Sequence, residues 1–264
     1  MSLFTQIQSK PPISTENGVP YYGSQEQGDQ FDKSDVESWT TGGRFARRWQ
    51  NRGKKNNVMV NDVFLDLCKT AASLSKLIME IACGPGMGLL PDIFAFNPNG
   101  NALATDACPA LVENWSRYMA QNAPDVGIEF ACFSATDMPI RSNSVDVITS
   151  MVGFGSLRYA GADNMDGVRE AYRVLKYGGH VFAIESQFED MKIVEKTFEL
   201  WGKPNWFENN KLTWKERFKQ AGFLVEQEIL HSLKTENDFE LGTVAQSFGL
   251  EIAMVYTAYM LRKV

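Results

Sequence analysis

The sequence lacks the features that assign a chain to several large classes of protein. Its four cysteines and two histidines form no Cys-x-x-Cys pair and no cluster at zinc spacing, which excludes a zinc module and favours reduced thiols. Lysine and arginine are in the minority, 26 against 32 acidic residues, and the net charge of −6 argues against a dedicated nucleic-acid binder. No apolar run approaches the roughly 20 residues of a membrane span, and the N-terminus lacks the order of a signal peptide. We expect a cytoplasmic protein with no membrane partner.

What the sequence does have is the composition of an ordinary globular protein of 264 residues, of which 44% are hydrophobic and 22% are charged. Residues 1–28 are rich in Gln, Ser, Pro and Gly and predict a mobile N-terminal arm. Residues 29–76 carry apolar residues at helical spacing and predict a helical cap. Residues 77–264 predict the core, with a lid insertion at about 187–214, where tryptophans gather.

Short apolar runs alternate with helical patterns along the core. Pro109 suits a first helical position, and the residues after it form an apolar stripe. A second helix is predicted over residues 164–176. The predicted strands are 77–82, 101–107, 128–135, 145–152, 180–186, 223–230 and 252–261. This alternation predicts an α/β fold with a parallel sheet and helices on both faces.

The most informative stretch, EIACGPGMG at residues 80–88, follows the first buried strand. Its glycines let the backbone approach a ligand closely, although a tight turn without a ligand has the same glycines. Asp106 ends the next strand, where a carboxylate can accept both hydroxyls of a ribose. Position 89 is Leu, so the third glycine of a dinucleotide-binding motif is absent, and Glu80 would repel a diphosphate. The pattern indicates a nucleoside ligand without phosphates.

Four motifs in order make the sequence resemble the class I S-adenosylmethionine-dependent methyltransferases, in particular small-molecule members with a methyltransferase domain 11 or 25. EIACGPGMG resembles the family's acidic-x-x-x-Gly-x-Gly motif, and ATDACP resembles its ribose-binding motif. SATDMPIRSNSVDVITS resembles the third region, and EAYRVLKYGGHVFAIE resembles the helix, Gly-Gly turn and strand that follow. The resemblance covers about residues 77–186. It implies a Rossmann-like, seven-stranded, mostly parallel sheet with an antiparallel last strand, capped by N-terminal helices.

The resemblance also implies which residues hold the cofactor S-adenosyl-L-methionine and its product S-adenosyl-L-homocysteine. Glu80 would accept the amino group of the methionine moiety, directly or through water. Asp106 would hold the ribose, and Asp137 would accept the adenine amine unless it only forms a turn before Pro139. The other expected contacts are Ala82, Cys83, Gly84 and Gly86 with the methionine moiety, Ala107, Cys108 and Met138 with adenine, and Met151 and Val152 with the methyl group.

The methyl acceptor is less well defined. Residues 151–155, Met-Val-Gly-Phe-Gly, depart from the Asn/Asp-Pro-Pro-aromatic motif of enzymes that methylate adenine or glutamine amides. His231 is a weak candidate for a catalytic base, and no set of metal ligands is present. Six basic residues within 44–55 form either a solvated helix face or a site for an anion. The residues expected to contact the acceptor are Trp39, Arg44, Arg48, Phe154, Trp201 and Trp206.

We expect methyl transfer to oxygen or nitrogen of a small molecule or peptide. A carboxylate is an attractive acceptor, because it is already ionised near neutral pH, needs no base and could be gripped by the basic N-terminal helix. Two alternatives stay open: an RNA-modifying methyltransferase, which aromatic residues within the basic cluster would suit, and a non-catalytic nucleoside-binding scaffold of the same fold. A monomer and a homodimer are both compatible with the sequence.

Overall fold

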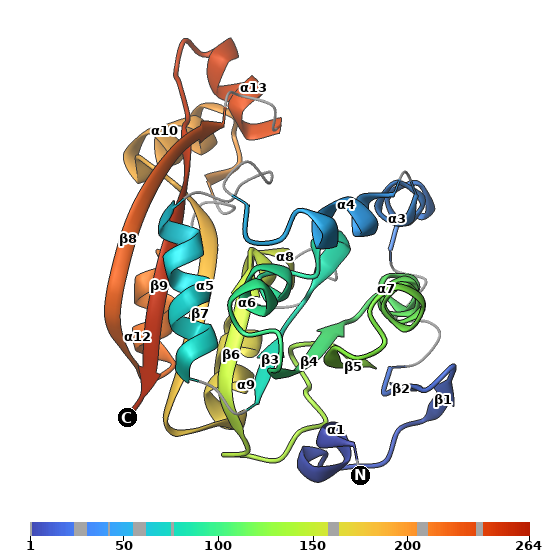
Figure 1. Cartoon of the computed structure of the whole chain (residues 1–264). Coiled ribbons are helices and arrows are strands. Elements are labelled where there is room, and N and C mark those ends of the chain that lie inside the picture. The colour runs from blue at the N-terminus through green and yellow to red at the C-terminus, as the bar shows by residue number, and fades with distance from the viewer. Residues whose placement is uncertain are drawn as a thin grey trace.

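The computed structural model of the chain describes residues 2–23, 31–41, 43–54, 62–74, 77–157, 164–204, 211–235 and 240–264 (Figure 1). The described strands are β1 (Ser14–Glu16), β2 (Val19–Tyr21), β3 (Ile78–Glu80), β4 (Asn101–Asp106), β5 (Gly127–Cys132), β6 (Val145–Met151), β7 (Leu175–Phe188), β8 (Phe223–Thr235) and β9 (Met254–Lys263). The described helices are α1 (Leu3–Ile7), α3 (Lys33–Thr40), α4 (Arg44–Gln50), α5 (Asp62–Leu74), the 3₁₀ turn η1 (Gly84–Gly86), α6 (Leu90–Phe96), α7 (Pro109–Asn122), α8 (Gly153–Ser156), α9 (Asn164–Val174), α10 (Met191–Leu200), α12 (Trp214–Gln220) and α13 (Glu240–Ser247).

Within the described residues the strands form one nine-stranded sheet in the order β1-β2-β5-β4-β3-β6-β7-β9-β8. Strands β3 to β7 run parallel, whereas β9 is antiparallel to both β7 and β8. This confirms the predicted α/β fold with a mostly parallel sheet and an antiparallel last strand. The prediction of seven strands is two too few, because β1 and β2 extend the sheet beyond β5.

Alternate residues of the strands build two cores, one on each face of the sheet. Ile78 of β3 and Ala102 of β4 belong to a cluster that includes residues of α4, α5, α6 and α7. Met79 and Leu103, the next residues along, belong to a second cluster with residues of α1, α9 and α12. Figure 1 shows α5, α6 and α7 in front of the sheet. The central strands are buried on both faces, which is why their apolar runs are continuous.

The N-terminal segment adds to the sheet edge. Asn17 and Gly18 have φ angles of 51° and 81°, as the tight turn of a hairpin requires, and they join β1 to β2. Tyr21 of β2 then pairs in parallel with Cys132 of β5, and Phe4 of α1 is 4% exposed. Within residues 2–23, a short helix, a hairpin and buried aromatic side chains thus pack against the sheet, which the composition of residues 1–28 does not indicate.

The expected helical cap consists of α3, α4 and α5 within the described residues. Figure 1 places α3 and α4 at the end of the sheet remote from α1, whereas α5 packs across its face. A smaller third core joins α10, in the expected lid insertion, to α13 through Val194, Phe198, Ala245 and Ile252. In the described ranges, the helices are all too short or too polar to cross a membrane.

Lys263, at the end of β9, supports a test of how the last strand is anchored. Its side chain is buried, and Nζ donates to the carbonyl oxygens of Tyr172 at 2.6 Å and Leu175 at 2.9 Å, and to Asn143 Oδ1 at 2.8 Å. We predict that Lys263→Met lowers the free energy of unfolding by about 2–3 kcal/mol, because it leaves these acceptors buried without a donor. Urea denaturation measures the loss. The exposed control Lys219→Met should change stability by less than about 0.5 kcal/mol; equal effects would contradict the anchoring role.

Candidate functional site

The strand-end pocket lies beyond the carboxyl ends of the parallel strands, where the loops after β3, β4, β5 and β6 meet. Its volume is about 300 Å³. Open parallel sheets bind ligands at this position, where the order of the strands reverses on either side of β3. The described residues that line it are Phe31, Trp39, Ala82, Gly84, Pro85, Asp106, Ala107, Leu111, Phe133, Ser134, Ala135, Ser156 and Leu157.

The turn after β3 is closed onto β4 and has an unusual backbone. Ala82 and Gly84 have φ angles of 47° and 55°, and the Cys83 amide donates to Thr105 O at 2.8 Å. A Cβ added at Gly84 would meet nothing within 4 Å, whereas a Cβ at Gly88 would lie 1.9 Å from Glu80 Oε1. Gly84 therefore presents bare backbone to the pocket, and Gly88 makes room for a buried carboxylate.

Asp106 links the two loops that form the floor of the pocket. Its Oδ2 accepts the Gly84 amide at 2.8 Å and its Oδ1 accepts the Cys108 amide at 2.9 Å. The residue is 8% exposed, and burial raises the pKa of its carboxyl against these hydrogen bonds, which lower it. Because a carboxylate oxygen has more than one lone pair, each oxygen retains capacity to accept a further hydrogen bond from a ligand.

Glu80 lies beneath the turn and does not line the pocket. It is fully buried, and its Oε2 accepts Thr149 Oγ1 at 2.5 Å and the Leu89 amide at 3.2 Å. Its Oε1 is buried and has no hydrogen-bond partner among the described residues. Burial raises the pKa of Glu80 to about 8, against the hydrogen bonds from Thr149 and Leu89. Its visible role is to hold the turn from below.

Arg48, an expected acceptor contact, forms an ion pair within the fold. Its guanidinium forms a two-pronged ion pair with Asp92 of α6, at 2.5 Å and 3.2 Å, and donates to Gly88 O at 3.1 Å. Asp92 also accepts the Gly53 amide at 2.7 Å, and its side chain is only 1% exposed. The pair ties α4 to the segment after the glycine-rich turn, because an unpaired carboxylate there would be costly.

Other members of the basic cluster also have local partners. Arg52 lies 4.7 Å above the Trp49 ring and donates to Trp49 O at 2.9 Å, and Lys54 donates to Asn51 Oδ1 at 3.3 Å. Arg44 begins α4, but its side chain lies outside the described part of the structure. The described contacts favour the interpretation of this cluster as a helix surface over an anion site.

Three residues after β5 line the strand-end pocket, whereas the sequence predicts contacts from Asp137 and Met138. Phe133, Ser134 and Ala135 face it. The Asp137 side chain is 78% exposed and pairs with Lys10 at 3.0 Å, and the Met138 amide donates to Glu170 Oε2 at 2.8 Å. The described pocket wall after β5 thus lies about three residues before the expected contact, because β5 ends at Cys132 and the pocket lies at its end.

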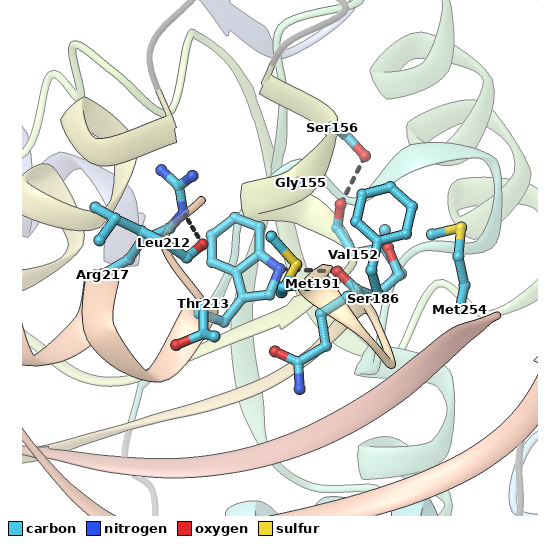
Figure 2. A pocket seen from close by; sticks show the side chains of 12 residues that line it. Val152, Gly155, Ser156, Ser186, Met191, Leu212, Thr213, Arg217 and Met254 are labelled. Atoms are coloured by element: carbon cyan, nitrogen blue, oxygen red, sulfur yellow. Dashed lines mark hydrogen bonds between the residues drawn. The ribbon is translucent and has the colours of Figure 1, made fainter. Parts of the chain in front are cut away.

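A second cavity, the α12 pocket, adjoins the first and is named after the helix that borders it. Its volume is about 200 Å³, and Ser156 lines both pockets. Figure 2 shows Leu212 and Arg217 on one side and Met254 on the other. The described lining residues are Val152, Gly155, Ser156, Ser186, Gln187, Phe188, Met191, Leu212, Thr213, Trp214, Arg217 and Met254.

Most polar side chains of the α12 pocket are already bonded to the protein. The donor and acceptor pairs are Trp214 Nε1 with Ser186 O at 2.9 Å, Arg217 Nε with Leu212 O at 3.2 Å, Ser156 Oγ with Val152 O at 2.6 Å, and Gln187 Nε2 with Thr257 Oγ1 at 3.1 Å. Figure 2 marks the first three as dashed lines. The remaining surface is formed by methionine, leucine, valine and aromatic side chains, so the cavity suits an apolar molecule.

The other residues expected at the site are distributed as follows. Trp39 and Ala107 line the strand-end pocket, and Val152 lines the α12 pocket. Phe154 is fully buried among Trp214 and Phe218, and Trp201 stacks on Phe198 in the third core. Trp206 and the side chain of His231 lie outside the described part of the structure. The remaining expected contacts, Cys83, Gly86, Cys108 and Met151, are neighbours of pocket-lining residues and are not on the walls themselves.

Within the described residues, no three His, Cys, Asp or Glu side chains are placed to hold a metal ion.

The chain is similar to known proteins in both sequence and structure. The model of the ubiE/COQ5 methyltransferase family matches residues 46–227. The demethylmenaquinone methyltransferase of Lactococcus lactis is 30% identical over 126 residues, which is 48% of each chain. The ubiquinone/menaquinone biosynthesis C-methyltransferase UbiE of Agrobacterium fabrum is 27% identical over 127 residues, again 48% of each chain. The chain thus spans about half the length of the curated relatives that it matches.

A solved structure extends the likeness in fold to nearly the whole chain. The crystal structure of the [4+2]-cyclase SpnF aligns with a TM-score of 0.61 at 16% identity, covering 97% of this chain and 99% of that one. At this identity the likeness concerns the fold alone.

The buried Glu80 leads to a prediction about stability and pH. Because its pKa in the folded protein is raised to about 8, its contribution to stability is complete below pH 4.5 and is lost as the pH rises through 8. We predict that the free energy of unfolding falls over this interval and that Glu80→Gln makes the fall shallower, since an amide does not ionise. Urea denaturation at a series of pH values measures both slopes. Parallel curves for the two proteins would show that Glu80 does not titrate as stated.

Proposed function

We propose that this chain, which belongs to the ubiE/COQ5 methyltransferase family, transfers a methyl group from S-adenosylmethionine to a small apolar molecule. The observation that carries the proposal is the adjacency of two unlike cavities. The strand-end pocket offers one carboxylate and bare backbone, the α12 pocket offers apolar walls, and Ser156 belongs to both. A donor and an acceptor bound side by side need only alignment for the transfer to occur.

The strand-end pocket fits the nucleoside part of this cofactor. Its described lining contains no lysine, arginine or histidine that would attract phosphates, and Asp106 is its single carboxylate. Asp106 would accept the two ribose hydroxyls, while the open face of Gly84 leaves room for the methionine moiety. We assign the adenine to the space between Ala107 and the Ser134–Ala135 backbone. The cofactor, when bound, supplies a methyl group already activated on a sulfonium.

The α12 pocket favours a mostly apolar acceptor, because methionine, leucine, valine and aromatic side chains form most of its described walls. Arg217 is its one ionisable lining side chain among the described residues, and it bonds to Leu212 O and lies over the Trp214 ring. An arginine remains protonated and cannot act as a base. Among the described lining residues no side chain can take up a proton, so we favour an acceptor atom that is nucleophilic without a protein base, such as a ring carbon beside a hydroxyl that ionises in solution. After the methyl group has been transferred to that carbon, its hydrogen leaves as a proton to water and the ring becomes aromatic again.

These points change the acceptor expected from the sequence. The expectation of a carboxylate relied on the basic cluster, in which Arg48 is now paired with Asp92. The expectation that oxygen or nitrogen is methylated did not depend on any particular residue of the sequence. Two relatives are named for methylating demethylmenaquinone and as a C-methyltransferase, so we place carbon of an apolar hydroxylated ring first. No contact in the described residues favours RNA.

The proposal is tested by incubating the purified protein with S-adenosylmethionine and chemically reduced demethylmenaquinone. We expect release of S-adenosylhomocysteine and a product heavier than the acceptor by one methylene group, both followed by mass spectrometry. A simple phenol and a single-stranded RNA serve as alternative acceptors in parallel reactions. Methylation of the RNA in place of the ring compounds would overturn the choice of acceptor, and binding of NAD in place of S-adenosylhomocysteine would overturn the choice of cofactor.

The role of Asp106 gives a quantitative prediction with a matched control. Asp106→Ala removes charge-assisted hydrogen bonds worth about 1.5–3 kcal/mol each, so the affinity for S-adenosylhomocysteine should fall by roughly 10- to several hundredfold. Isothermal titration calorimetry measures the change. Asp137→Ala is the control: its carboxylate is mostly exposed and bonds to Lys10, and we expect its affinity to equal that of the wild type. A reversed ranking would restore Asp137 as the nucleoside contact.

A further inference from the structure

Glu185, near the end of β7, is a buried carboxylate that neither pocket contains. It is fully buried and accepts three hydrogen bonds from a single neighbouring strand and loop. Its Oε1 accepts the Phe154 amide at 3.0 Å and Ser150 Oγ at 3.3 Å, and its Oε2 accepts the Gly155 amide at 3.1 Å. Two of these donors are consecutive amides of α8, so the carboxylate holds the backbone of that short helix.

The segment held in this way, residues 152–156, is the wall between the two pockets. Val152 and Gly155 line the α12 pocket, and Ser156 lines both pockets. The wall begins with Val152 in the left-handed region, at φ 57° and ψ 16°, which is a strained conformation for a β-branched residue. Such a conformation persists only where surrounding contacts hold it. The Glu185 carboxylate supplies two of these contacts, to the amides of Phe154 and Gly155.

The wall is also fitted tightly against its surroundings. A Cβ at Gly153 would lie 2.6 Å from Ser150 Oγ and 2.7 Å from Ile81 O. A Cβ at Gly155 would lie 3.1 Å from Glu185 Oε2 and 3.7 Å from the Trp214 ring. The backbone of the wall at Gly155 therefore lies directly against the carboxylate.

We propose that Glu185 is a positioning residue for methyl transfer: it fixes the wall that sets the acceptor against the donor. The inference rests on the proposed function, because it assigns the two pockets to donor and acceptor. Transfer between two bound molecules depends steeply on their alignment, and a displacement of about 1 Å is enough to slow it markedly. Glu185 acts through the backbone of α8 and touches neither ligand.

The charge state of Glu185 adds a pH dependence to this role. Burial raises the pKa of Glu185 to about 8, against the hydrogen bonds from Gly155, Phe154 and Ser150, which favour the ionised form. The ionisable groups of the described residues that act on it are Glu80 from β3 and Tyr259 from β9. The ionised carboxylate accepts both amides more strongly than the neutral acid, whereas the buried charge lowers the free energy of unfolding. We therefore expect transfer per folded molecule to be faster above pH 8 than below it.

The test compares Glu185→Gln with the wild type in transfer to reduced demethylmenaquinone. Glutamine keeps one acceptor oxygen and places an amide donor against an amide donor of α8. We expect kcat to fall by about 10- to 100-fold, since one hydrogen bond to a charged group is lost, with little change in KM for S-adenosylmethionine. The increase in rate as the pH passes 8 should disappear. The matched control Glu195→Gln changes an exposed carboxylate of α10 and should keep the wild-type rate and pH profile.

Two outcomes decide against the proposal. If Glu185→Gln keeps the wild-type kcat and pH profile, the wall does not depend on the carboxylate. If it only lowers the fraction of folded protein, while kcat per folded molecule and the pH profile are unchanged, Glu185 is structural. Should Glu185→Gln not fold, Glu185→Asp keeps the charge but withdraws the carboxylate from the Phe154 and Gly155 amides, and it must reproduce the fall in kcat on a smaller scale.

A separate measurement distinguishes failure of this inference from failure of the proposed function. If the wild type does not methylate reduced demethylmenaquinone, hydrogen exchange of the peptide covering residues 152–157 still reports on the wall. We expect exchange of the Phe154 and Gly155 amides to be about tenfold faster or more in Glu185→Gln than in Glu195→Gln. Equal exchange in the two variants would overturn the inference, whatever the acceptor is.

Discussion

The hydrogen bond from the Gly84 amide to the Asp106 carboxylate joins the two loops on which the strand-end pocket is built. Because Asp106 also accepts the amide of Cys108, one side chain sets the turn after β3 and the start of α7 together. Trp115 of α7 closes the connection by donating its indole N–H to Gly84 O at 3.1 Å. The ring centroids of Trp115 and Phe45 are 4.3 Å apart. Since Phe45 belongs to α4, this contact also positions the cap helix relative to the turn after β3.

Buried carboxylates that accept backbone amides occur at the carboxyl ends of three strands of the sheet. Glu80 at the end of β3, Asp106 at the end of β4 and Glu185 near the end of β7 are all buried, and each accepts backbone amides of a loop at that edge. Burial raises the pKa of each of the three. Since an unbonded buried carboxylate is costly, each residue holds its loop in place. Of the three, only Asp106 also reaches a pocket wall.

The basic cap illustrates how a charge pattern is resolved by packing. A run of arginines on a helix is compatible with a solvated surface, an anion site and a phosphate-binding face, because charge alone does not name the partner. Asp92 of α6, 1% exposed, decides the matter for Arg48. An aromatic residue among these arginines is also used in packing. The ring centroids of Trp49 and Phe94 are 6.3 Å apart, and both residues belong to the core beneath the cap.

The sequence by itself determined the order of strands and helices in the core and the place of Asp106, because these follow from local apolar periodicity and from the meeting of parallel strand ends. The sequence also contains Asn17-Gly18, which is typical of a hairpin turn, but it does not predict that this hairpin pairs with β5. Only the tertiary structure decided the partner of Arg48, the shift of the pocket wall from Asp137 to Ser134, and the hold of Glu185 on α8. Each of these depends on contacts between segments about 30 or more residues apart, or on where a strand ends, and no local pattern encodes them.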